Sequence, residues 1–158
     1  MATLKFENAS FPPAFKFVGG SFAFMDELPD AGGTFPAPGP IHPAKSNMFI
    51  QTDQGTHVHI GFKVTGWASL IMNGTWKAQV FLEKQGKSEV TTAPFVGTTA
   101  HNPGFPLPKS VNINVNIPAL SEGLYRVSLM ITFETNAGVK LPFAASTDIG
   151  LLTVYKAS

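Results

Sequence analysis

The sequence predicts an all-β protein, built as an antiparallel β-sandwich that carries an N-terminal extension. Apolar side chains alternate with polar ones at a period of two in several stretches, which is typical of half-buried strands. No stretch keeps the helical period that marks an amphipathic helix. Turn signals separate the alternating stretches at intervals of roughly 10–20 residues, and the uneven strand lengths favour a sandwich over a barrel.

The N-terminal extension, residues 1–46, is rich in Phe, Pro and Gly and holds seven of the 14 phenylalanines. Its prolines and paired glycines exclude long helices and central strands, so we expect two short strands, Ala2–Glu7 and Ser21–Met25. Disordered segments lack aromatic residues. We therefore expect the extension to belong to the same domain and to pack across the sandwich or across a neighbouring subunit.

Residues 47–158 are expected to form the core of the sandwich. Strands are predicted at Met48–Gln51, His57–Thr65, Trp76–Glu83, Val111–Ile117 and Leu124–Glu134; Val139–Phe143 begins a strand, and Ile149–Tyr155 completes the last one. Ser88–Thr92 is predicted to form at most a short edge strand, and the proline-rich segment Ala93–Pro108 is predicted to be a long loop.

The composition indicates one soluble, cysteine-free domain. A chain of 158 residues buries a proper core without disulfides, and the absence of cysteine excludes thiolate catalysis and zinc fingers. Charged residues make up 13% of the chain, about half the usual share, which favours an interface or an assembly. The 11 basic and 10 acidic residues do not cluster and Arg126 is the single arginine, so no nucleic-acid binding is expected.

The N-terminus lacks the basic and apolar regions of a signal peptide. No apolar run reaches the roughly 18 residues of a membrane span. We therefore expect a cytoplasmic protein, with export by a non-classical route left open.

The segment "IPALSEGLYRVSLMITFETNAG", residues 117–138, has an apolar strand, a Ser-Glu-Gly corner and then Tyr-x-Val-x-Leu. It resembles the E–F corner of fibronectin type III and other immunoglobulin-like domains, where a tyrosine bonds back to the corner backbone. Tyr125 occupies the matching place, and Trp76 resembles the buried tryptophan of strand C. The resemblance covers residues 47–157, without the two cysteines of antibody domains. It implies an immunoglobulin-like sandwich, a fold that hosts many functions.

Two histidines lie one residue apart in "THVHIGFKVTG", a spacing found in metal sites. His57 and His59 share one face of their strand, opposite the apolar residues that face the core. Zinc needs three or four converging ligands, and only His101 and Asp53 are candidates for a third. We therefore expect no metal or other cofactor, and a strand face exposed to solvent.

No catalytic motif is present. The sequence lacks G-x-S-x-G, H-E-x-x-H and G-x-G-x-x-G, and Phe81 stands where a phosphate loop ending in Gly86-Lys87-Ser88 needs glycine. The carboxylates of Asp26, Glu27 and Asp30 are expected to be solvated. The protein is therefore predicted not to be an enzyme.

Asn112, Asn114 and Asn116 form a ladder of amides on one strand face. A row of paired donors and acceptors beside an exposed ring is a pattern of carbohydrate-binding sandwiches, and Phe81 or Trp67, the latter in a loop, is the candidate ring. The alternative is a polar strand face that meets water or neighbouring side chains.

Phe81, Leu124 and Met130 fall on outward positions of their strands and are expected to form an apolar patch. The extension covers this patch within the chain, or another subunit covers it. The leading interpretation is a non-catalytic protein–protein interaction or structural module that self-associates by edge-strand pairing or by burial of a neutral face. Carbohydrate binding is the alternative.

Overall fold

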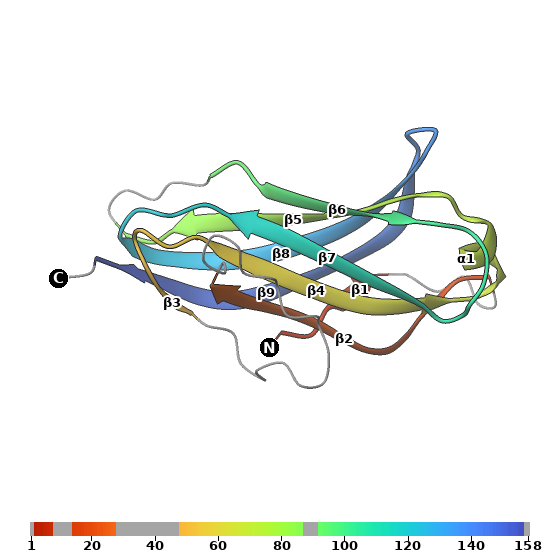
Figure 1. Cartoon of the computed structure of the whole chain (residues 1–158), viewed down its shortest axis with the longest axis horizontal. Coiled ribbons are helices and arrows are strands. Elements are labelled where there is room, and N and C mark those ends of the chain that lie inside the picture. The colour runs from red at the N-terminus through yellow and green to blue at the C-terminus, as the bar shows by residue number, and fades with distance from the viewer. Residues whose placement is uncertain (1, 8–13, 28–47, 87–91, 157–158) are drawn as a thin grey trace.

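The computed structural model has two β-sheets packed face to face, and it describes residues 2–7, 14–27, 48–86 and 92–156 (Figure 1). The elements are β1 Lys5–Glu7, β2 Lys16–Glu27, β3 Phe49–Gln51, β4 Thr56–Thr65, α1 Trp67–Ile71, β5 Gly74–Lys84, β6 Phe95–His101, β7 Lys109–Ile117, β8 Gly123–Thr135 and β9 Lys140–Tyr155. The prediction of an all-β sandwich is confirmed.

The larger sheet has the strand order β1-β9-β8-β5-β6, and β3 also pairs with β9. The smaller sheet has the order β2-β4-β7. Among the strands that the structure describes, every ladder is antiparallel except that of β3 with β9. A short hairpin joins β8 to β9, whereas the connection through α1 carries the chain from β4 of the smaller sheet to β5 of the larger sheet.

The period-two alternation places apolar side chains between the sheets. In β7 the buried residues are Val111, Ile113, Val115 and Ile117, and the intervening asparagines are exposed. Aromatic rings fill one part of this core: Trp76 packs against Phe133 with 4.8 Å between ring centroids, and Phe15 stacks on Phe143 at 4.1 Å. Rings at such distances add attraction beyond the burial of their area.

Strand β6 corrects the prediction of one long loop at Ala93–Pro108. Phe95–His101 pairs with β5 along the register from Gly74↔His101 to Val80↔Phe95. The prolines of this segment lie on either side of β6, at Pro94 and from Pro103 onward, so the seven residues between them keep every N–H for the ladder. The predicted strand Ser88–Thr92 falls mostly outside the described residues.

Strand β2 is longer than the predicted Ser21–Met25. Its register with β4 shifts between Val18 and Phe22, at the Gly19-Gly20 pair, so a bulge absorbs the glycines and pairing continues on both sides. Ala2 bridges Ala23 of this sheet, whereas Phe6 pairs with Ala145 of the larger sheet. The N-terminal segment therefore joins the two sheets, and the expected boundary at residues 46 and 47 lies outside the described residues.

The corner before β8 has the hydrogen bond that the tyrosine pattern predicts. The Tyr125 hydroxyl donates to the Ser121 carbonyl at 2.9 Å, and the Ser121 hydroxyl lies 2.9 Å from the Tyr125 hydroxyl oxygen. The Tyr125 side chain is buried, as is Trp76 on β5. The corner is thus fixed by a side-chain bond four residues back along the chain.

Candidate functional site

The His57 and His59 side chains are buried, each about 1% exposed, so the expectation of a solvent-exposed strand face is wrong. β4 is the middle strand of the smaller sheet, and its first seven residues, Thr56–Phe62, are buried without a break. The two imidazoles lie edge to face with 4.2 Å between centroids, and Phe24 of β2 lies 5.2 Å from the His59 ring. In a strand that is buried on both faces, the polar side chains of an alternating pattern are buried as well as the apolar ones. Alternation in the sequence does not show whether the polar face is covered.

His101 has a structural role that excludes it as a third ligand beside His57. It is buried at the end of β6, where Trp76 Nε1 donates to its Nδ1 at 3.2 Å and its Nε2 donates to the Ser69 carbonyl at 2.9 Å. This arrangement requires the neutral imidazole with its proton on Nε2. Burial lowers the pKa of His101, the bond to Ser69 opposes this, and the charge of Lys109 lowers it further.

Asp53 is exposed in the turn after β3 and does not join the histidines. No group of three His, Cys, Asp or Glu side chains that could hold a metal ion occurs among residues 2–7, 14–27, 48–86 and 92–156. His57 and His59 therefore lie together, and neither Asp53 nor His101 joins them as a third ligand.

The asparagine ladder lies on the outer face of the smaller sheet, and all three side chains are exposed. Gly61 of β4 lies between Asn112 on one side and Phe22 on the other. A Cβ on Gly61 would overlap the Phe22 ring, so this ring lies over the glycine that pairs with Asn112. Phe81 lies on the outer face of the other sheet, so it is not the ring beside the ladder.

Trp67 lies in the short helix α1, although the sequence suggested a loop. Its side chain is 58% exposed, and Ile71, one turn later on the same helix, is 68% exposed. Gly104 donates to the Leu70 carbonyl at 2.8 Å, which brings the neighbouring Phe105, 81% exposed, to this end of the molecule. We call Trp67, Ile71 and Phe105 the α1 tip. The sequence signal for it was a pair of apolar residues four apart and a phenylalanine between prolines.

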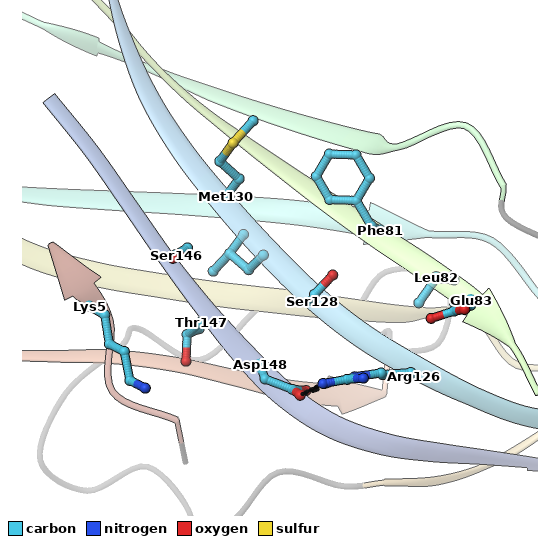
Figure 2. Close-up of a pocket in the computed structure, with 11 residues that line it drawn as sticks. Lys5, Phe81, Leu82, Glu83, Arg126, Ser128, Met130, Ser146, Thr147 and Asp148 are labelled. Atoms are coloured by element: carbon cyan, nitrogen blue, oxygen red, sulfur yellow. Dashed lines mark hydrogen bonds and ion pairs between the residues drawn. The ribbon is translucent and has the colours of Figure 1, made fainter. Parts of the chain in front are cut away.

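Phe81 and Met130 lie on the outer face of the larger sheet and are diagonal neighbours, because Phe81 pairs with Ser128 and Met130 with Gln79. Figure 2 shows their side chains on one side of a shallow groove of about 690 Å³. Lys5 and the Arg126–Asp148 pair line its other side, and serine and threonine hydroxyls contribute to its floor. Met130 is 37% exposed, and Phe81 is half-buried.

Leu124, 39% exposed, is on the same outer face but lies apart from the groove, four residues before Ser128. Its neighbours on β9 include two exposed side chains that sequence reasoning missed, Leu151 and Tyr155. Both precede or follow buried residues of β9, so they point away from the core. We call Phe81, Leu124, Met130, Leu151 and Tyr155 together the sheet face.

A bulge in β9 lies next to Asp148, which pairs with Arg126 on this face. The register with β8 skips one residue, Gly150 takes a φ of 125°, and its N–H donates to Asp148 Oδ1 at 3.1 Å. Asp148 Oδ2 accepts from Arg126 Nη2 at 2.8 Å. The hydrogen bond and charge of Asp148 raise the pKa of Arg126, although both groups are exposed and their pairing stabilises the fold little.

No helix among the described residues is long and apolar enough to cross a membrane. The sequence matches no known protein-family model, and a search of curated proteins gives no significant match.

Proposed function

We propose that the protein is a non-catalytic module that acts by protein–protein contact and self-associates through the sheet face. The observation that carries this proposal is the set of apolar side chains on adjacent strands β5, β8 and β9, four of which are 37–54% exposed. Apolar side chains gathered on one surface, rather than scattered singly, mark a contact surface.

The charges of this surface favour contact between identical copies. Glu83 lies opposite Arg126 in the β5–β8 ladder, and Glu134 lies opposite Lys140 in the β8–β9 ladder. Asp148 pairs with Arg126 as well. Since each acid has a basic neighbour within the same face, two copies meet without a large excess of like charge.

The edges of the larger sheet, which carries the sheet face, favour face-to-face contact over edge-strand pairing. The outer edge of β9 is already paired with β1 and β3. At the opposite side of the sandwich, a Cβ on Gly97 of β6 would overlap the Asn114 carbonyl of β7, so β6 lies directly against that edge. Edges occupied in this way offer few free backbone groups to a second chain.

The face is large enough for a stable contact. Strands about 4.8 Å apart make β9, β8 and β5 about 14 Å wide, and a rise of about 3.4 Å per residue makes the β5–β8 ladder about 37 Å long. This footprint of about 530 Å² per copy, about 1,060 Å² for two copies, reaches the roughly 1,000 Å² that a biological interface needs. A symmetric dimer packed through this surface is therefore geometrically reasonable.

Mass measured by light scattering over a concentration series tests the proposal. The wild-type protein is expected to form a dimer, and the double variant Leu124→Ser, Leu151→Ser is expected to be a monomer with an unchanged urea midpoint. Val139→Ser, an exposed apolar residue outside the sheet face at 56% exposure, is the matched control. A wild-type protein that stays monomeric at the highest concentration would overturn the proposal.

We also infer that the sandwich is of the immunoglobulin type. In that fold strands B and E share one sheet and C, F and G share the other. With β4, β7, β5, β8 and β9 as B, E, C, F and G, the observed pairings follow this order, and β6 lies beside β5 where variable domains add C′. The Tyr125–Ser121 hydrogen bond supports the same assignment.

A second candidate function is carbohydrate binding at the asparagine ladder. The Phe22 ring over Gly61, next to Asn112, is the specific observation that favours it. A ring face beside a row of amides offers both stacking and hydrogen bonds to a sugar chain. Binding on a glycan array that is lost in Asn114→Ala and weakened in Phe22→Ala would support it, and an array without signal would remove it.

A further inference from the structure

A second surface, at the end of the sandwich that carries α1, is independent of the sheet face. We propose that the α1 tip, Trp67, Ile71 and Phe105, docks on the surface of an anionic lipid bilayer. Figure 1 shows α1 and the β6–β7 connection together at one end of the molecule. These three side chains are 58–81% exposed, and each is large and apolar.

The α1 tip is held firmly on the core. Ala68 donates to the Ala14 carbonyl at 2.8 Å, and the Ser69 hydroxyl donates to the Gly66 carbonyl at 2.7 Å. The Ser69 carbonyl in turn accepts from the buried His101, which also accepts from Trp76. The apolar side chains are therefore presented by a fixed backbone, so little ordering is needed when they enter an apolar phase.

Lysines lie just behind these side chains. Lys16 begins β2 and pairs with Thr65, two residues before Trp67, and Lys109 begins β7 and pairs with Val64. The charge of Lys109 reaches His101, whose ring is bonded to α1. The acidic residue that the structure describes at this end is Glu134, and it lies opposite a basic residue, Lys140, in the β8–β9 ladder.

The apolar side chains of the α1 tip lie outermost, and the lysines lie behind them at the first residues of β2 and β7. This order matches the layers of an anionic bilayer. Trp and Phe are favoured at the boundary between headgroups and acyl chains, and lysines are favoured at the level of anionic headgroups. Contact between two α1 tips of identical copies would instead bring the lysines of both copies together. The charge of the tip therefore favours an anionic surface over a second copy.

Vesicle binding followed by tryptophan fluorescence tests the proposal directly. Trp76 is about 1% exposed, so a blue shift on adding vesicles reports Trp67. We expect a shift and co-sedimentation with phosphatidylcholine vesicles that contain about 30% phosphatidylserine, and much weaker binding without it. Since each lysine near such a surface strengthens binding about fivefold, Lys16→Gln with Lys109→Gln should weaken it about 25-fold.

Variants of the apolar residues separate the contributions of the tip. Ile71→Ser with Phe105→Ser should abolish vesicle binding, whereas Trp67→Phe should keep binding and lose the blue shift. Lys156→Gln, an exposed lysine directly after β9, which ends at the side of the sandwich opposite α1 (Figure 1), is the control for charge and should bind as the wild type does. Circular dichroism of each variant checks that the fold is unchanged.

The proposal is overturned if the wild-type protein binds neither vesicle at low salt, or if Ile71→Ser with Phe105→Ser binds as well as the wild type. It is also overturned if the tip variants lower the mass seen by light scattering while vesicles leave Trp67 fluorescence unchanged, because the tip would then contact a second copy. We expect the double variant Leu124→Ser, Leu151→Ser to lose self-association and to keep vesicle binding. This result would show that the sheet face and the α1 tip act independently.

Discussion

The buried hydrogen-bonded chain from Trp76 through His101 to Ser69 predicts a stability that depends on pH. Replacing His101 by glutamine removes the titrating group and replaces Nδ1, the acceptor for Trp76 Nε1, by the oxygen of a more flexible amide. A buried N–H without a partner costs about 1–3 kcal/mol, which is the upper bound for the loss of unfolding free energy in His101→Gln near pH 7.5. Glutamine can still donate to the Ser69 carbonyl, which keeps the loss below that of a full truncation.

The direction of the pH effect follows from the lowered pKa of His101. Burial holds this pKa below the ordinary value of 6.5, so the unfolded chain binds the proton more tightly than the folded chain does. The contribution of His101 to stability is therefore complete above pH 6.5 and is lost as the pH falls toward the folded pKa. The loss is about 1.4 kcal/mol for each pH unit within that window.

Urea unfolding followed by Trp76 fluorescence, at about pH 7.5 and about pH 5.5, measures both effects. Since the chain has four histidines, the informative quantity is the difference in pH slope between the wild type and His101→Gln. The wild type should lose more stability on acidification than the variant does. Equal slopes in the two proteins would refute the assignment of a neutral, buried His101.

Three further substitutions test the fold at single contacts. Tyr125→Phe removes the hydrogen bond to Ser121 and should lower the free energy of unfolding by about 1 kcal/mol in urea melts. Gly97→Ala should cost about 1–3 kcal/mol in the same assay, because its Cβ meets the backbone of Asn114; a neutral result would contradict the close approach of β6 and β7. Arg126→Ala breaks an exposed ion pair and should change the urea midpoint by less than Tyr125→Phe does. A larger loss would contradict the small contribution assigned to this ion pair.

Much of the sandwich was predictable because alternation maps directly onto strands with one buried face. The stretch from Val111 to Ile117 shows this most simply, since its apolar residues are buried and its asparagines are exposed. Strand β6 escaped prediction because it alternates Val96, Thr98 and Ala100 with small or polar inward residues such as Gly97. Its pairing depends on β5, which a local pattern does not contain.

The positions of the candidate site residues were predicted less well, for a different reason. His57 and His59 were assigned correctly to one strand face, but whether that face meets water depends on what packs over β4. Phe81 and Met130 point outward as expected, and only the three-dimensional register makes them neighbours. Exposure is a tertiary property, so sequence patterns give the side on which a residue lies and leave its surroundings open.

The sheet face and the α1 tip make a joint prediction about the orientation of the dimer. A dimer whose two-fold axis runs along the strands presents both α1 tips in the same direction, and the second tip then binds a bilayer as an intramolecular event. An axis across the strands points the tips apart and gives no such gain. The wild-type protein should therefore bind anionic vesicles more tightly than Leu124→Ser, Leu151→Ser only in the first arrangement. If the wild type is a dimer and both proteins bind anionic vesicles with equal affinity, the two-fold axis runs across the strands.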